Sequence, residues 1–267
     1  MMQRAITGAI FLVVMISGIL YSEWSLFALV MLITAGGQWE YYRMINTTDA
    51  RPKRLLGTLT GLTLVAGAFM CVKMHDPTLL VATLLLPFFG IADTVFNKSA
   101  KPYHDIAHTF FAVLYIALPM ALIGIMGLQV SDRYQAGVVM FYFATIWIYD
   151  TFAYLSGRFF GKHKLLERVS PKKTWEGAAG GFLTGIAASY FATPFMPEGT
   201  AWWQCAAFAA VVMVTGTLGD LSVSVIKRSV GAKDTGGLLP GHGGLLDRFD
   251  SQLLSAAPAY LTLWLLM

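Results

Sequence analysis

Residues 220–250 hold the densest group of chemically active side chains in this chain. The segment contains four acids, four cations, one histidine and six glycines, although only 13% of the whole chain is charged. Glycine lets backbone N–H groups approach an anion, Lys and Arg neutralise phosphate charge, and spaced aspartates can hold a divalent metal ion. This composition is typical of a site that handles a nucleotide. We call residues 220–250 the signature segment.

Three aspartates of the signature segment are candidate metal ligands. Asp220 ends an apolar helix, and Ser224 follows on the same face. Residues 231–244 contain too much Gly and Pro for a regular helix, so we expect a loop and then a new helix that carries Asp247 and Asp250 on one face. Asp220, Asp247 and Asp250 could converge on Mg²⁺, which prefers a few carboxylates plus substrate phosphates. For Asp250, a purely structural charge at a helix start is an equal alternative.

A second candidate region precedes the signature segment. Asp150 lies inside an apolar run, where a carboxylate is costly and usually pairs or faces a polar cavity. Tyr154, four residues later, shares its helix face. The structural alternative is a helix-packing seam in which Asp150 bonds to a neighbouring helix.

Lys172 and Lys173 lie beside a predicted helix start, with Ser170 or Thr174 as the expected cap. A pair of cations next to a helix N-terminus is a plausible phosphate site. As an isolated motif this pattern is weak.

The elements that must position these residues are membrane spans. The chain is 56% hydrophobic with a mean hydropathy of +0.61, and apolar runs of roughly 20 residues recur along it, which is typical of a polytopic helical membrane protein. The sequence therefore predicts an all-α fold with a polar site cavity that faces the cytoplasm. We place about nine spans, at residues 5–21, 24–43, 55–74, 78–96, 105–128, 136–156, 176–196, 203–224 and 252–267.

Lys and Arg are distributed unequally between the two sides of these spans. Seventeen of the 19 fall on one side, and only Lys73 and Arg133 fall on the other. Cytoplasmic loops carry the excess of cations, so we expect the N-terminus and the site in the cytoplasm and the C-terminus outside. Glu40 and Asp93 lie near the cytoplasmic ends of their spans, where we expect hydrogen bonds within the fold to satisfy them.

The chain divides into two predicted parts. Residues 1–130 form N-terminal spans, about five in number, and residues 131–267 form the catalytic region that includes the signature segment. The two cysteines, Cys71 and Cys205, lie in apolar runs and are expected to be free thiols. Nothing in the sequence points to a nucleic-acid partner.

The signature segment resembles that of the phosphatidate cytidylyltransferase family, also called CDP-diacylglycerol synthases. The family pattern runs from a serine through Lys-Arg, Lys-Asp and Leu-Pro-x-His-Gly-Gly to a final Asp-Arg-x-Asp. Its fixed positions are all present, as Ser224, Lys227, Arg228, Lys233, Asp234, Gly236, Leu239, Pro240, His242, Gly243, Gly244, Asp247, Arg248 and Asp250. Residues 150–177 also resemble the family.

The resemblance implies an integral membrane enzyme that joins CTP to phosphatidate from the bilayer, giving CDP-diacylglycerol and diphosphate. It also implies Mg²⁺ dependence, with a second, monovalent cation left open, a homodimer, and a place in the bacterial inner membrane. The expected catalytic residues are Asp220, Lys227, Arg228, Asp247 and Arg248. The expected substrate contacts are Ser224, Lys233, Asp234, His242, Gly243, Gly244, Lys172, Lys173, Asp150 and Tyr154.

Two other functions compete with this interpretation. A CTP-dependent kinase acting on a polyprenol or similar lipid would need a base such as Asp150 or His242, and the complete signature argues against it. An ion or proton transporter would spread its acids through the membrane depth, whereas the acids here gather near the basic loops.

Overall fold

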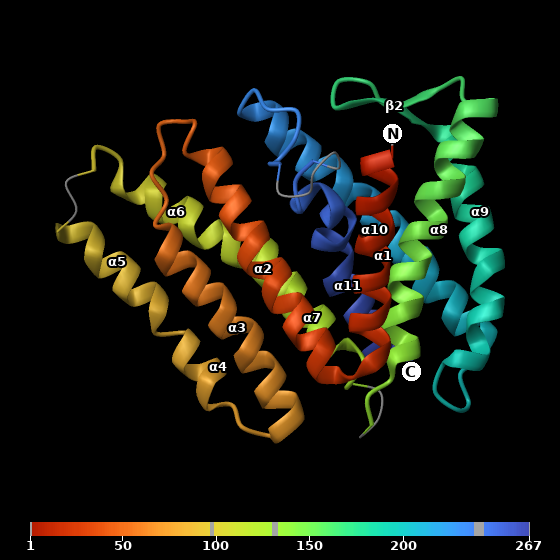
Figure 1. Ribbon diagram of the computed structural model, residues 1–267, viewed down its shortest axis with the longest axis horizontal. Coiled ribbons are helices and arrows are strands. Elements are labelled where there is room, and N and C mark those ends of the chain that lie inside the picture. The colour runs from red at the N-terminus through yellow and green to blue at the C-terminus, as the bar shows by residue number, and fades with distance from the viewer. Residues whose placement is uncertain (1, 97–98, 130–132, 238–242, 267) are drawn as a thin grey trace.

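The computed structural model describes residues 2–96, 99–129, 133–237 and 243–266, which are mostly helical. The start of α1 and the end of α11 lie at opposite ends of the bundle (Figure 1). The helices in chain order are α1 (Met2–Tyr21), α2 (Glu23–Ile45), α3 (Arg54–Met74), α4 (Thr78–Thr83), α5 (Leu86–Phe96), α6 (Pro102–Ala112), α7 (Leu118–Met126), α8 (Ala136–Phe160), α9 (Trp175–Ala192), α10 (Trp202–Ser229) and α11 (Asp250–Leu266). The short elements are the π-helical turn η1 (Val113–Ala117), the strands β1 (Lys164–Leu166) and β2 (Ser170–Thr174), and the 3₁₀ turns η2 (Thr193–Phe195) and η3 (Leu246–Arg248).

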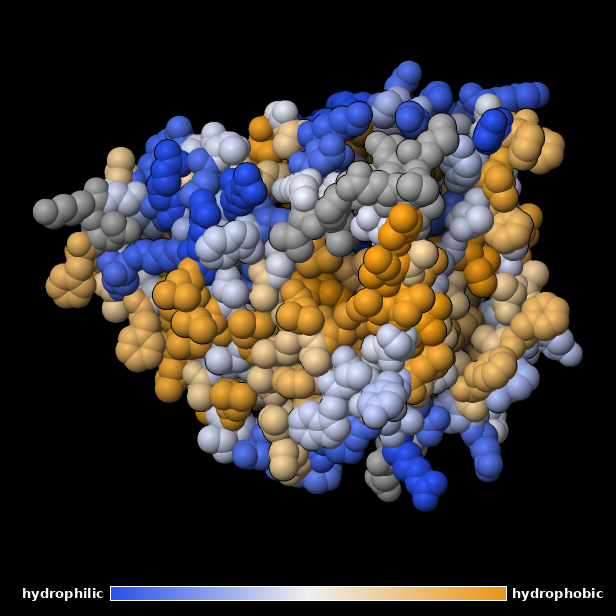
Figure 2. Space-filling view, viewed as in Figure 1, coloured by the Kyte–Doolittle hydropathy of each residue, from blue (hydrophilic) through white to orange (hydrophobic). Residues whose placement is uncertain are grey.

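The surface confirms the prediction of an all-α polytopic membrane protein. A band of apolar residues crosses the middle of the molecule, and hydrophilic residues lie above and below it (Figure 2). Large side chains such as Leu55, Phe96 and Leu183 are exposed in this protein, as expected for residues that face lipid. Among the described residues, five helical stretches are long and apolar enough to cross a membrane. The predicted number of nine spans therefore stays a prediction.

Helices α8 and α9 pack together through glycines. A Cβ added to Gly177 would lie 2.7 Å from the carbonyl oxygen of Ala153, and one added to Gly181 would lie 2.8 Å from that of Tyr149. Only glycine allows two helix backbones to come this close. We call this contact the α8–α9 glycine seam.

A short β-hairpin joins α8 to α9, which the sequence did not predict. Strands β1 and β2 are antiparallel, with Lys164 opposite Thr174 and Leu166 opposite Ser170. Thr174 is the N-cap of α9, because its Oγ1 accepts a hydrogen bond from the backbone N–H of Gly177 at 3.1 Å. Of the two caps considered, Thr174 is therefore correct, and Ser170 begins a strand instead.

The end of the signature segment also differs from the prediction. Asp247 lies in the 3₁₀ turn η3, whereas Asp250 is the first residue of α11, so the two do not share one helix face. Phe249 separates them with a φ of −121°, outside the helical range. Its ring is buried and contacts Phe11 with ring centroids 5.9 Å apart, and this packing explains the break in the helix.

The N-terminal helices pack against the elements that carry the signature segment. Helix α1 contacts α8, α7 contacts α11, and α2 contacts η3. The division of the chain near residue 130 stays a prediction.

Candidate active site

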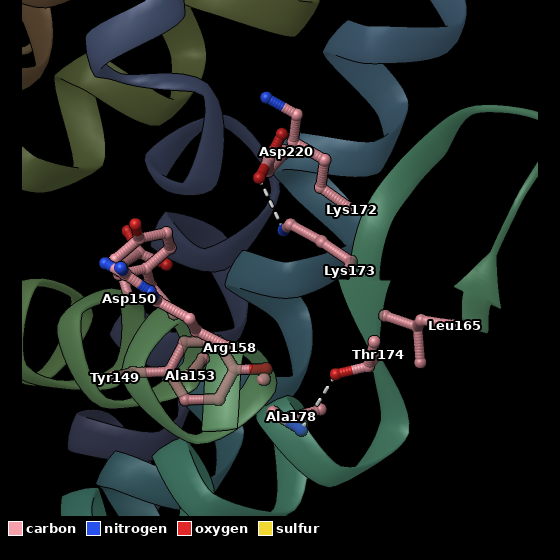
Figure 3. Close-up of a pocket in the computed structure, with 13 residues that line it drawn as sticks. Tyr149, Asp150, Ala153, Arg158, Leu165, Lys172, Lys173, Thr174, Ala178 and Asp220 are labelled. Atoms are coloured by element: carbon pink, nitrogen blue, oxygen red, sulfur yellow. Dashed lines mark hydrogen bonds and ion pairs between the residues drawn. The ribbon is translucent and has the colours of Figure 1, made fainter. Parts of the chain in front are cut away.

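A polar cavity of about 340 Å³ lies where α8, the hairpin, α9 and α10 meet (Figure 3). It unites the two regions that the sequence singled out, because Asp150 and Tyr154 come from α8, Lys172 and Lys173 from β2, and Asp220 from α10. The lining residues are Tyr149, Asp150, Ala153, Tyr154, Gly157, Arg158, Leu165, Lys172, Lys173, Thr174, Gly177, Ala178 and Asp220. We call this space the polar cavity.

Lys173 and Asp220 form an ion pair across the polar cavity (Figure 3). Burial alone would lower the pKa of Lys173, but the charge and hydrogen bond of Asp220 outweigh it and raise this pKa above its ordinary value. Lys173 therefore stays cationic at neutral pH. Ser224 contacts the other oxygen of Asp220 at 3.4 Å, one turn further along α10.

The N-terminus of α9 opens onto the same cavity. Thr174 and Gly177 line it, and α9 runs for 18 residues beyond the cap. The partial positive charge at a helix start favours an anion, and so do the nearby side chains of Lys172 and Arg158. The cavity therefore has the charge expected of a phosphate site.

Two carboxylates line the polar cavity, and a third lies where α11 begins. Asp150 and Asp220 are the two in the cavity, and Asp250 is the first residue of α11. Helices α10 and α11 approach closely here, since a Cβ added to Gly219 would lie 2.5 Å from the carbonyl oxygen of Asp250. Oxygen ligands of this kind suit Mg²⁺.

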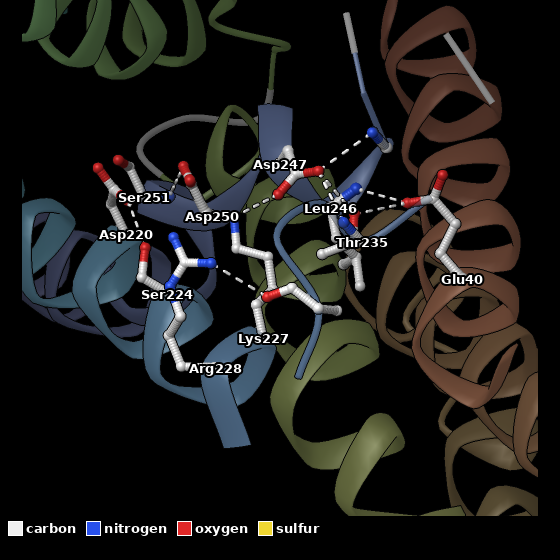
Figure 4. Close-up of polar contacts among 12 residues, drawn as sticks. Glu40, Asp220, Ser224, Lys227, Arg228, Thr235, Leu246, Asp247, Asp250 and Ser251 are labelled. Carbon is white, nitrogen blue, oxygen red and sulfur yellow. Dashed lines mark hydrogen bonds and ion pairs between the residues drawn. The ribbon is translucent and has the colours of Figure 1, made fainter. Parts of the chain in front are cut away.

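Asp247 belongs to a second polar cluster (Figure 4). Its Oδ1 is 2.6 Å from Lys227 Nζ, and its Oδ2 accepts bonds from the backbone N–H groups of Thr235 and Gly244 at 2.9 and 3.1 Å. Burial alone would raise the pKa of Asp247, but these hydrogen bonds outweigh it and lower the pKa below its ordinary value. Both oxygens of this carboxylate are thus already occupied by protein donors.

The predicted convergence of Asp220, Asp247 and Asp250 on one metal ion finds no direct counterpart. In residues 2–96, 99–129, 133–237 and 243–266, no group of three or more His, Cys, Asp or Glu side chains is arranged to hold a metal. Gly219, which precedes Asp220, packs against the backbone of Asp250, while Asp247 bonds to Lys227. Lys173 and Ser224 contact the two oxygens of Asp220, so the metal ligands stay a prediction.

The other predicted residues are spread along the rim of the site. Arg228, Lys233, Asp234 and Arg248 are exposed, and Arg228 donates to the carbonyl oxygen of Ala232 at 3.2 Å. Gly243, Gly244 and His242 were predicted to contact the substrate. Gly243 has a φ of 82°, which favours glycine, and Gly244 packs beside Thr235. His242 lies outside the described residues.

The structure adds residues that the sequence interpretation had not assigned to the site. Arg158 lines the polar cavity, Glu40 and Thr235 contact each other beside Asp247, and Tyr115 in the π-helical turn bonds to Ser222 of α10. A buried acid such as Glu40 in an apolar helix is a signal that could have found one of them. Tyr115 carries no comparable signal.

The fold and site define a helical membrane protein with a cation-lined cavity at one end of its helices. Comparison with known proteins is more specific. The chain belongs to the cytidylyltransferase family, whose model matches residues 2–266.

Relatives in three staphylococci are named phosphatidate cytidylyltransferase. The protein of Staphylococcus saprophyticus is 36% identical over 172 residues, which are 64% of each chain. That of Staphylococcus epidermidis is 37% identical over 168 residues, 63% of each chain, and that of Staphylococcus aureus is 34% identical over 172 residues, 64% of each chain. The aligned part thus spans less than two thirds of these relatives, and the predicted family resemblance is confirmed.

Proposed function

We propose that this protein joins CTP to phosphatidate, forming CDP-diacylglycerol and releasing diphosphate. The names of the staphylococcal relatives support this reaction. The observation that carries the proposal is a wall shared by the polar cavity and an apolar groove, because phosphatidate itself joins a phosphate to two acyl chains.

The apolar groove has a volume of about 650 Å³ and runs between α9 and α10 below the hairpin. It shares Tyr149, Leu165 and Ala178 with the polar cavity. Trp175, Leu183 and Leu218 in its lining are exposed. A lipid could therefore place its phosphate among cations while its chains stay in contact with apolar side chains.

The chemistry of this transfer requires little proton transfer from the protein. The phosphomonoester of phosphatidate has a second pKa of about 6, so it is mostly a dianion at neutral pH. One of its oxygens forms a bond to the α-phosphorus of CTP, and the bond from that phosphorus to the β-phosphate oxygen breaks. The electron pair leaves with diphosphate. A general base is not needed.

The protein's task is to bring two polyanions together and to stabilise charge on the leaving group. Lys172, Lys173 and Arg158 supply positive charge around the polar cavity, and the dipole of α9 adds partial positive charge at its first turn. Lys173 is held in place by Asp220, which keeps its charge oriented.

Mg²⁺ is the cation that we expect at the carboxylates of α8, α10 and the start of α11. Asp150 and Asp220 line the polar cavity, and Gly219 brings α10 against the backbone of Asp250, so these acids would favour a bound cation. We propose that Asp220 and Asp250 hold Mg²⁺. The ion would neutralise charge on the phosphates of CTP. Asp220 would exchange its contact with Lys173 or Ser224 for the ion, and Asp247 could join only by exchanging a bond to Lys227 or the loop.

We also propose that the site faces the cytoplasm and that the C-terminus lies outside. The unequal distribution of Lys and Arg supports this orientation. The hairpin and the segment after α10, both rich in cations, lie at the same end of the bundle as the start of α1 (Figure 1). The homodimer and the monovalent cation stay predictions.

The experiment uses purified protein in detergent with phosphatidate, Mg²⁺ and CTP labelled at the α-phosphate. We expect label in the chloroform phase, lost with EDTA, and a higher Mg²⁺ requirement in Asp220→Asn. The control is Asp49→Asn, which changes an exposed acid outside the polar cavity and should behave as wild type. Absence of lipid label from folded wild-type protein would refute the transfer. Label moving from γ-labelled CTP to a polyprenol would favour a lipid kinase.

A further inference from the structure

Glu40 is an almost fully buried acid in α2, with 3% of its surface exposed. It lies 195 residues before Thr235 of the signature segment, yet its side chain contacts that threonine (Figure 4). A buried carboxylate is costly unless its hydrogen bonds compensate for lost hydration. Its partners therefore indicate what this acid is for.

One oxygen of the Glu40 carboxylate has two partners next to Asp247, which are Leu246 and Thr235. Its Oε2 accepts from the backbone N–H of Leu246 at 3.0 Å, and Leu246 directly precedes Asp247. The same oxygen lies 3.2 Å from the hydroxyl of Thr235, whose backbone N–H donates to Asp247 at 2.9 Å. Glu40 thus contacts the residue before Asp247 in the chain and one of the residues that donate to its carboxylate.

Two glycines make room for this side chain. A Cβ added to Gly236 would lie 2.7 Å from Glu40 Oε1, and one added to Gly244 would lie 2.6 Å from Oε2. These contacts are tighter than real Cβ atoms accept. The loop therefore closes over Glu40 only because both positions are glycine.

We propose that Glu40 is a positioning residue, which fixes Thr235 and Leu246 to α2 so that Asp247 and Lys227 keep the arrangement needed for the transfer. The inference rests on the proposed function. Glu40 acts through the loop and touches no substrate. It gives the N-terminal helices a direct part in shaping the site.

The test compares Glu40→Ala and Glu40→Gln with a matched control in the same helix. Gln38 is also fully buried, and its Nε2 donates to the carbonyl oxygen of Gly57 in α3 at 3.3 Å. Gln38→Ala therefore removes a buried side chain of similar size without touching the loop. Glu40→Gln keeps the shape and one acceptor oxygen that can receive both bonds.

We expect Glu40→Ala to lower kcat by about 100-fold per folded molecule, as for a displaced reacting group, and Glu40→Gln to recover most of it. Gln38→Ala should lose thermal stability and keep its kcat. Equal kcat values for the folded Glu40→Ala and Gln38→Ala proteins would overturn the proposal. Glu40→Gln as inactive as Glu40→Ala would overturn it too, because the charge rather than the hydrogen bonds would then be required.

Hydrogen exchange gives a readout that does not depend on the reaction. In Glu40→Ala the amide of Leu246 should exchange faster, while amides in α9 remain as protected as in Gln38→Ala. If wild-type protein transfers no cytidylyl group, the proposed function fails and exchange alone decides the positioning claim. Unchanged exchange at residues 235–237 and 243–247 would then overturn it.

Discussion

Lys173 of strand β2 forms an ion pair with Asp220 of α10. The two residues lie in regions that the sequence marked separately, and the pair joins them in the polar cavity. Asp220 thereby raises the pKa of Lys173. The hairpin also contacts α8 and α9, and this ion pair links it directly to α10.

The first prediction concerns Lys173. Lys173→Gln removes a cation from the phosphate cavity and frees Asp220, so we expect cytidylyl transfer to fall by about 100-fold, comparable to loss of one charge-stabilising donor. Lys164→Gln, in the neighbouring strand and outside the cavity lining, should keep its activity. Initial rates with labelled CTP measure both. Equal activities in the two variants would show that Lys173 does not contact the reacting phosphates.

The second prediction concerns the pair of Lys227 and Asp247, each with only 12% of its side chain exposed. Lys227→Met leaves a buried carboxylate unpaired and should cost about 3–5 kcal/mol at neutral pH. The pKa of Asp247 is lowered in the fold, so the pair stabilises the protein above the ordinary carboxyl pKa of about 4 and loses this effect as pH falls.

Thermal unfolding of wild type and Lys227→Met at several pH values measures the difference in stability between the two proteins. This stability difference should be present in full near pH 7 and shrink as the pH falls below about 4. The exposed pair of Lys101 and Asp49 is the control, and Lys101→Met should leave the melting temperature unchanged. A difference that grows on acidification would contradict the assigned sign.

The third prediction concerns Gly244. A Cβ here would lie 2.6 Å from Glu40 and 2.7 Å from the backbone nitrogen of Gly236, so Gly244→Ala should cost about 1–3 kcal/mol and lower activity. Gly237→Ala is the matched control in the same loop, because no described atom lies within 4 Å of its added Cβ. Denaturation in detergent compares them. Equal stability of the two variants would mean that the loop tolerates the added methyl group.

The fourth prediction concerns the apolar groove. Ala179→Trp would fill part of it and should raise KM for phosphatidate about tenfold, a typical effect of altering an apolar pocket, while KM for CTP stays unchanged. Ala188→Trp provides a control on the same helix, since Ala188 lines a different apolar cavity of about 520 Å³. Similar effects of both substitutions on phosphatidate would argue against acyl binding in the groove.

The helical membrane architecture and two acids of the polar cavity were predictable from sequence for physical reasons. Apolar runs of membrane length stand out in any chain, and Asp150 and Asp220 are conspicuous because acids are costly there. Both indeed line the polar cavity. Periodicity along a helix was enough to place Asp150 and Tyr154 on the same wall.

What the sequence could not show depends on contacts between distant residues or on short elements. The hairpin has strands of only three and five residues, with no alternation to reveal them. The bond between Glu40 and Leu246 crosses 206 positions. The break between Asp247 and Asp250 depends on burial of Phe249, which no local pattern indicates.

The α8–α9 glycine seam has a consequence for how substrates enter. Where Gly157 and Gly177 line the polar cavity, the wall is main chain, and no change of rotamer can widen it. The side chains that can change the width of the cavity lie elsewhere in its lining, in Tyr154 and Arg158 of α8 and in Lys172 and Lys173 of β2. We therefore expect the glycine side to keep its shape while these side chains adjust to whatever the cavity binds.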